Sequence, residues 1–371
     1  MSLRYNRALS CLTARRESSS VLQITLGKPS PAYLHDVVYG RLGARRRDVV
    51  VGPKHGVDNA VVRVGPGKVV AATTDPLSYI PALGPRYSAW LSVNLIASDL
   101  ATSAISPQYG IFDFNLPPKM PDSQFATYWA HFHSECKRLG IAIIGGHTGR
   151  YQGCDYTVIG GGVMYAVGPE DGYLTSEMGQ VGDDLILTKG AAIETTAVLA
   201  RSFPKTVKKA LGAKLFERAR TYLEKVSTVK DSLTAASVGL HQKGVTAMHD
   251  ATEGGVLAAV LELTNASGVG AMIDLESIPI SQETNEICRL FGIDPFFSLS
   301  EGSLVLACKP TRAGRVIRRL KEARIDSNVI GQLTKSRQVF GVSRKVRSRV
   351  SYPKFDPYWK AYWNATRKHW K

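Results

Sequence analysis

Short runs of β-branched residues alternate with longer helical patterns along the chain, and this alternation restricts the fold to an α/β or α+β architecture. In the first half, strands are expected at 48–51, 60–64, 69–74, 109–115, 141–144 and 156–167, and helices at 88–105 and 122–139. A Gly-Pro-Gly turn at 65–67 predicts a hairpin between the second and third strands. The segment MGQVGDD at 178–184 interrupts the pattern and predicts a domain boundary.

A second series of strands and helices follows this interruption. Its strands are expected at 185–188, 245–248, 270–275, 303–308 and 328–333, and its helices begin at Ala192, Asp231, Gly254, Gln282 and Thr311. A length of 371 residues suits two domains that each bury a core. We therefore expect a mobile basic extension at 1–20, an N-terminal domain at 21–178, a C-terminal domain at 179–345 and a basic aromatic tail at 346–371.

Composition excludes several classes of protein. A hydrophobic content of 44% argues against a disordered chain, and no apolar run reaches the roughly 18 to 20 residues of a membrane helix. The five cysteines are widely spaced and form no CxxC pair, so neither a zinc site nor a disulfide framework is expected. The first twenty residues lack the apolar core of a secretory signal, and we expect a cytoplasmic protein.

Three isolated aspartates stand out in the first half. Asp99 is the only charged residue between Arg86 and Asp113, on an apolar predicted helix, where a carboxylate is costly to bury without a cation or several donors. Asp75 ends an apolar strand and Asp58 opens the strand before it. Such carboxylates suit Mg²⁺ with nucleotide phosphates, because the ion prefers oxygen ligands. Taken singly, each also fits a turn, a cap or a satisfied core carboxylate.

Two glycine-bearing segments follow predicted strands. In GGHTG, at 145–149, glycines allow backbone amides to approach an anion, but a tight turn explains the segment equally well. His147 within it fits a metal ligand, a phosphate donor or a turn residue. In HDATEGG, at 249–255, helix N-terminal amides can face an anion, while capping alone explains Asp250. Neither GxxxxGK[ST] nor a strand-coupled GxGxxG occurs, so an ATP site here would be of another kind.

Seven loose motifs in a specific order carry a resemblance to a known superfamily. They are DNAVV (58–62), TTDP (73–76), ASDLATS (97–103), GGHTG (145–149), VGDDLILTKG (181–190), HDATEGG (249–255) and SEGSLVLA (300–307). Over roughly residues 21–345, the chain resembles the superfamily of aminoimidazole ribonucleotide (AIR) synthetase, the hydrogenase maturation factor HypE, selenophosphate synthetase and thiamine-monophosphate kinase. The last two motifs look closest to the HypE branch.

The resemblance implies a two-domain PurM-like fold: an N-terminal ATP-binding domain that pairs with its twin in a homodimer, and a C-terminal α+β domain over the cleft. It implies ATP and Mg²⁺ as cofactors, with Asp58, Asp75 and Asp99 matching the metal-binding aspartates. The residues expected to contact the nucleotide are Asp58, Asn59, Thr74, Gly145, Gly146, Thr148 and Lys189. The implied reaction is transfer of the γ-phosphoryl group to a carbonyl, carboxamide or phosphate oxygen of a small or carrier-bound substrate.

Motif placement adds hypotheses for catalysis. Lys28 and the Gly-loop amides would stabilise charge that develops in phosphoryl transfer. His147, His249 and Asp250 are candidates for positioning or proton transfer. A strand-to-helix turn explains Lys189 as well as a phosphate contact does.

Departures from the superfamily narrow the reaction. His147 stands where the kinase has GGD and the purine enzyme GGE, as in selenophosphate synthetases, which puts one metal-ligand position in doubt. Lys28 matches the lysine of selenophosphate synthetases, but no cysteine closely precedes it, so selenium chemistry is not expected. HypE proteins end in a carbamoyl-accepting cysteine, whereas no cysteine follows Cys308, so the HypE reaction itself is not expected.

The segment from Arg344 onward mixes cations with aromatic residues, as in proteins that stack single-stranded bases. The i, i+4 spacing of Tyr358 with Tyr362 and of Trp359 with Trp363 equally describes an amphipathic helix that docks on the body or on a dimer partner. We favour docking, because exposed clusters of this size are rare. The alternative to an enzyme is a noncatalytic member that binds RNA or another polyanion. The formal charge of +16 lies mostly outside the motifs and could steer anions.

Overall fold

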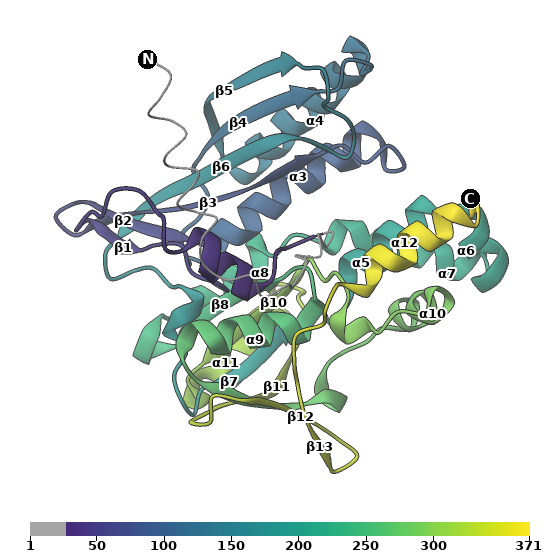
Figure 1. The fold of residues 1–371 in the computed structure, drawn as a ribbon. Helices are drawn as coiled ribbons and strands as arrows, with labels where there is room; N and C mark the ends of the chain where they lie inside the picture. Colours follow the sequence, from purple (N-terminus) through teal and green to yellow (C-terminus); the bar gives the residue numbers. More distant parts are fainter. Residues whose placement is uncertain (1–26) are drawn as a thin grey trace, which may run out of the picture.

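A six-stranded sheet organises the first half of the computed structural model, which describes residues 27–371 (Figure 1). Its strands are β1 (Val49–Val51), β2 (Ala60–Gly65), β3 (Lys68–Ser78), β4 (Tyr109–Leu116), β5 (Ala142–Arg150) and β6 (Val158–Pro169), in the order β1-β2-β3-β6-β4-β5. The predicted hairpin is confirmed, because β2 pairs antiparallel with β3. Only the β4–β5 pair is parallel among these six strands.

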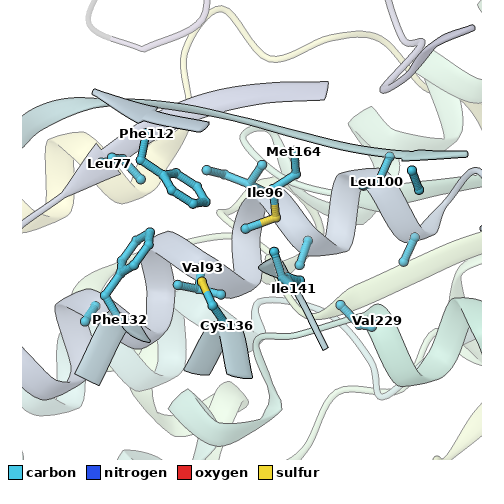
Figure 2. Packing of buried hydrophobic residues seen from close by; sticks show 14 of the residues in the cluster. Leu77, Val93, Ile96, Leu100, Phe112, Phe132, Cys136, Ile141, Met164 and Val229 are labelled. Carbon is cyan, nitrogen blue, oxygen red and sulfur yellow. The ribbon is translucent and has the colours of Figure 1, made fainter. Parts of the chain in front are cut away.

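Two helices cover one face of this sheet. They are α3 (Gly84–Ala101) and α4 (Asp122–Leu139), and α4 has the bounds that the sequence predicts. Figure 2 shows side chains such as Phe112, Ile96 and Phe132 filling the core between sheet and helices. Because α3 is apolar around most of its circumference, it can be buried on both sides. It contacts β3 and β6 on one side and α8 (Val229–Ala236) of the second half on the other.

The second half is organised by a seven-stranded sheet. Its strands are β7 (Asp184–Thr188), β8 (Val245–Ala251), β9 (Gly270–Asp274), β10 (Ser303–Cys308), β11 (Ser327–Thr334), β12 (Val339–Ser343) and β13 (Val346–Arg349), in the order β13-β12-β9-β11-β7-β10-β8. Helix α9 (Gly255–Ser267) packs on one face, and α8 with α11 (Pro310–Glu322) packs on the other. Both faces are covered, which explains why every residue of β8 and β10 is buried.

A helical group extends one end of the second half (Figure 1). It comprises α5 (Ile193–Ser202), α6 (Pro204–Leu211), α7 (Ala213–Arg220), η3 (Thr221–Lys225), α10 (Gln282–Phe291) and α12 (Pro357–Arg367). The remaining short elements are α2 (Pro31–Tyr33), η1 (Leu34–Val38), η2 (Ser176–Met178), η4 (His241–Lys243), η5 (Leu275–Ser277) and η6 (Pro295–Phe297). Tyr358, Trp359 and Tyr362 of α12 pack into this group, as the docking interpretation of the tail predicts.

Other predictions were only partly right. The strand expected at 141–144 continues to Arg150 as β5, and residues 346–349, which we assigned to the tail, form β13. The expected helix at 88–105 begins at Gly84 and ends at Ala101. The mobile extension expected at 1–20 lies outside the described residues. Between residues 27 and 371, none of the helices has the length and apolar character needed to cross a membrane.

Candidate active site

Carboxylates from both halves of the chain meet where α3 lies against the second half. Asp58 lies in the loop before β2, Asp75 on β3 and Asp99 in the last turn of α3, while Asp250 comes from β8 and Glu301 from the loop before β10. Burial raises the pKa of Asp99 well above its ordinary value, and the charges of the other four carboxylates raise it further. The structure therefore brings together the three aspartates predicted to bind metal and adds two carboxylates from the second half.

Local structure explains why these carboxylates point inward. Alternation along β3 puts Asp75 on the same face as buried Leu77, which packs in the core with α3, and puts Thr74 on the opposite face. Asp99 lies near the C-terminus of α3, where the helix dipole disfavours a negative charge. A carboxylate in that position needs a nearby cation.

Asp250 is buried, with 1% of its surface exposed, and neither of its carboxylate oxygens has a hydrogen-bond donor among the described residues. Burial and the charge of Asp58 raise the pKa of Asp250 to about 6, against the opposing effect of His249. The Asp99 carboxyl lies beside it and could donate only if it were protonated. Ligand atoms of Asp58, His249 and Asp250 lie within 4.8 Å of one another, which is a spacing that suits a metal ion.

His249 is held between two carboxylates. Its Nδ1 lies 2.7 Å from Asp58 Oδ1, and its Nε2 lies 2.8 Å from Oε2 of Glu262 on α9. Burial alone would lower the pKa of His249, but the contacts with Asp58 and Glu262 outweigh it and raise the value to about 10. His249 is therefore a cation with both nitrogens engaged, and we assign it to positioning Asp58 rather than to binding a metal.

Lys28 is the second cation of the cluster. It lies in an exposed segment, but its Nζ donates to Thr252 Oγ1 at 2.6 Å, and its backbone N–H donates to Glu253 Oε2 at 2.8 Å. Burial would lower the pKa of Lys28, but the carboxylates, foremost Glu262 and Asp99, raise it overall. The predicted catalytic lysine is therefore charged and adjacent to the carboxylate cluster.

The cluster carries more negative than positive charge. Burial raises the pKa of Asp75 to about 7, with Lys28 opposing and Asp250 and Glu253 adding to the shift. Burial likewise raises the pKa of Glu301 well above its ordinary value, and its Oε2 has no hydrogen-bond partner among the described residues. Buried carboxylates without donors are stabilised by cations, and an oxygen-only donor set favours Mg²⁺ over softer metals.

Three of the residues predicted to contact the nucleotide make hydrogen bonds within the fold. Asn59 is buried and donates to the Asp99 carbonyl and to Thr102 Oγ1, both at 2.8 Å. The hydroxyl of Thr74, on the outer face of β3, donates to the Gly162 carbonyl at 2.9 Å. Lys189 donates to two backbone carbonyls and lies 3.0 Å from Asp231, so its ammonium group is held away from the carboxylate cluster.

Strand β5 carries four further predicted residues: Gly145, Gly146, His147 and Thr148. They lie within the strand rather than in a turn after it, and β5 is an edge strand. His147 aligns with Asp113 on β4, which aligns with Gly161 on β6 and then Pro76 on β3. Three strand spacings separate β5 from β3, about 14 Å. Within one chain, His147 therefore does not reach Asp75; it pairs with Tyr151 instead, at 2.7 Å.

The sequence analysis did not single out three glutamates that are buried in or beside the cluster. Glu262 on α9 and Glu194 on α5 are 6% exposed, and Glu301 is 9% exposed. Glutamates in helices are ordinarily solvated, so their sequence context gives no signal of burial. The HDATEGG and SEGSLVLA motifs did mark two of the segments that meet here.

The two sheets and the carboxylate cluster between them define a two-domain α/β protein with buried carboxylates at the domain junction. The chain belongs to the AIR synthase related family: the N-terminal domain model of that family matches residues 56–164, and the C-terminal domain model matches residues 180–343. The fold is the PurM-like two-domain fold expected from the motifs.

Several proteins are similar to this one over most of the chain. Carbamoyl dehydratase HypE of Azotobacter vinelandii is 25% identical over 304 residues, which cover 78% of this chain and 84% of that protein. Selenide, water dikinase of Methanocaldococcus jannaschii is 26% identical over 294 residues, covering 75% and 80%. The solved structure of AaThiL complexed with AMPPCP and TMP has a TM-score of 0.65 at 18% identity, covering 87% of this chain and 97% of that chain.

Proposed function

We propose that the protein is an enzyme that binds Mg²⁺-ATP at the domain junction and uses it to phosphorylate or activate an oxygen of a small or carrier-bound substrate. The observation that carries this proposal is the buried excess of carboxylates, above all Asp250, whose two oxygens have no donor among the described residues. Such a site is costly without a cation and is well suited to bind one.

The residues present fit Mg²⁺. Asp58, Asp75, Asp99 and Asp250 would hold it, because they supply hard oxygen ligands from separate elements. When bound, the metal and ATP supply charge neutralisation and a transferable phosphoryl group. The order of the motifs and the similar proteins support ATP binding. Two of these relatives are named as a carbamoyl dehydratase and a selenide, water dikinase, and AaThiL was solved with AMPPCP.

The chain's own residues prepare this site. His249, fixed by Glu262, orients the Asp58 carboxylate. Lys28 brings an ammonium group, held by Thr252, to the edge of the cluster, where it can stabilise charge on a phosphoryl oxygen. The low exposure of Asp250 and Glu301 indicates a water-poor environment, in which these charges interact strongly.

We also propose a homodimer and a division into domains at 21–178 and 179–345. The outer face of the first sheet exposes apolar side chains, including Ile111 at 43% and Val163 at 39%, which are neighbours on β4 and β6. Strand β5 ends this sheet with an open edge. An apolar face beside an open edge is a surface that a second copy can cover.

A double variant tests the metal and nucleotide assignment. We expect Asp75→Asn with Asp99→Asn to lose Mg²⁺-ATP binding in calorimetry at matched salt, and to lose ATP hydrolysis. The control is Asp171→Asn with Asp326→Asn, because both of these aspartates are exposed away from the cluster. Binding by the first double variant as tight as that of the wild type would show that the metal assignment is wrong.

A further inference from the structure

Glu194 is a buried carboxylate that the proposed metal site does not use. It lies in the first turn of α5, with 6% of its surface exposed, and its Oε2 has no hydrogen-bond partner among the described residues. The preceding Ala192 adopts a left-handed conformation, with φ of 53°, at the start of the helix. That conformation is unfavourable for alanine, so the local backbone is held in place by its surroundings.

The groups nearest to Glu194 are acidic. Burial raises its pKa to about 8, and the charges of Asp356, Glu253 and Asp75 raise it further. Asp356 accepts from the backbone N–H groups of Gly254 and Tyr358, each at 2.8 Å. Glu253 accepts from the Lys28 N–H and from Trp359 Nε1. These two carboxylates therefore have donors within the fold, whereas Glu194 Oε2 has none between residues 27 and 371.

The position of Glu194 relates it to the proposed phosphoryl-transfer site. The start of α5 is bonded to the loop that carries Glu301: the Ala192 N–H donates to Ser300 Oγ at 2.6 Å, and the Thr195 N–H donates to the Leu299 carbonyl at 3.2 Å. Glu194 therefore lies next to Glu301, in the part of the fold where α5 packs with α12. Tyr358 on α12 is buried beside it, and Glu194 contributes to the raised pKa of that phenol. An acceptor for the phosphoryl group must lie beside the metal carboxylates, and Glu194 and the Tyr358 ring adjoin them there.

We propose that Glu194 is a recognition residue of the acceptor subsite and binds a protonated nitrogen of the substrate, as found in an alkylammonium or amidinium group. The inference rests on the proposed function and specifies that the substrate carries a positively charged nitrogen. An organic cation suits a carboxylate beside the Tyr358 ring, because aromatic faces attract cations. A second Mg²⁺ fits less well, because Asp356 and Glu253 already accept from N–H groups and leave few oxygens for an ion that requires six.

Thermal melting of the full chain with simple amines tests the proposal. The probes are agmatine and 1,4-diaminobutane, the uncharged match is 1,4-butanediol, and Mg²⁺ with a non-hydrolysable ATP analogue is present throughout. The variants are Glu194→Gln and, as control, Glu217→Gln on the surface of α7. We expect an amine to raise the melting temperature of the wild type and the control, and to bind Glu194→Gln at least tenfold more weakly.

Several outcomes would overturn the inference. One is that Glu194→Gln binds the amine as tightly as the wild type, and another is that the wild type binds no amine. A third is that Mg²⁺ alone shifts the melting temperature of Glu194→Gln differently from that of Glu217→Gln, which would assign Glu194 to a metal. Without ligands, Glu194→Gln should melt no lower than the wild type, because it removes an uncompensated buried charge; a lower melting temperature would indicate a structural role. Calorimetry with Mg²⁺-ATP separates the two proposals: intact nucleotide binding without amine binding refutes only this inference.

Discussion

At the scale of single residues, charge compensation around His249 determines how the site is held. Its imidazolium lies between Asp58 and Glu262, and the Glu262 pKa falls to about 2, because Lys28 and His249 outweigh the opposing effect of burial. The three residues come from a loop before β2, from β8 and from α9. The ion-paired set therefore joins the two halves of the chain as well as orienting a proposed metal ligand.

His249→Leu is expected to destabilise the protein by about 3–5 kcal/mol, since it leaves two buried carboxylates without their cation. Urea denaturation followed by circular dichroism measures the loss. The double variant His249→Leu with Glu262→Leu should recover part of it, because one of the two uncompensated charges is then absent. Equal stability of His249→Leu and the wild type would contradict the assignment of His249 as a buried cation.

The stability effect of Glu194 should depend on pH. Its pKa rises from 4.5 to about 8 on folding, through burial first and then Asp356, Glu253 and Asp75, so the folded state binds the proton more tightly. The resulting stability is fully present below about pH 4.5 and is lost as the pH rises towards about 8. Relative to the wild type, Glu194→Gln should gain up to a few kcal/mol between about pH 5 and pH 8. Urea titrations in EDTA measure this difference; a difference that stays constant with pH would contradict the buried, uncompensated state.

The sequence revealed part of this site for a physical reason. Asp58, Asp75 and Asp99 were recognisable because isolated carboxylates in apolar surroundings are unusual. Glu194 and Glu262 lie on helices where charged residues are common, and only packing against distant elements buries them. The burial of these two glutamates depends on tertiary contacts, which sequence periodicity does not predict.

At the scale of elements, local patterns predicted α4 to the residue but misjudged β5. Helix α4 has an amphipathic pattern and ends at Gly140, whose φ of 74° allows a left-handed cap. In β5, the glycines suggested a turn, yet pairing with β4 continues through Gly145 and Gly146 to Arg150. Glycine is compatible with a turn and with the interior of a strand, and the parallel partner β4 that decides between them was not visible in the sequence.

The two ends of α9 provide a matched test of close packing. Gly255 and Gly268 have nearly equal φ values of +71° and +69°, so alanine costs about 1 kcal/mol of strain at either position. A Cβ at Gly255 would lie 2.6 Å from the Phe296 carbonyl oxygen and 2.7 Å from the Ser298 nitrogen, whereas a Cβ at Gly268 meets nothing within 4 Å. Gly255→Ala should therefore lose about 1–3 kcal/mol more than Gly268→Ala in urea denaturation. Equal losses would show that the HDATEGG loop can move away from η6.

At the scale of the whole molecule, acidic and basic charge are separated. The formal charge is +16, yet the domain junction gathers buried carboxylates that outnumber Lys28 and His249. Basic residues are frequent elsewhere, as in exposed 344–349 around β13. A basic exterior can attract an anionic nucleotide, and on the proposed function the acidic interior would favour the nucleotide form that carries Mg²⁺. The tail does not favour the RNA-binding alternative, since three of its rings pack into the helical group.

The outer face of the first sheet is the proposed dimer interface, and a substitution on it tests the homodimer. A charge on the outer face of the first sheet should prevent a second copy from covering it, because an unpaired carboxylate would be buried in the interface. We expect the wild type to sediment at twice the chain mass of 40.3 kDa and Val163→Asp to sediment as a single chain. Val346→Asp, on the exposed strand β13 of the other sheet, is the matched control and should remain a dimer. A single-chain mass for the wild type, or an unchanged mass for Val163→Asp, would mean that this face is not the dimer interface.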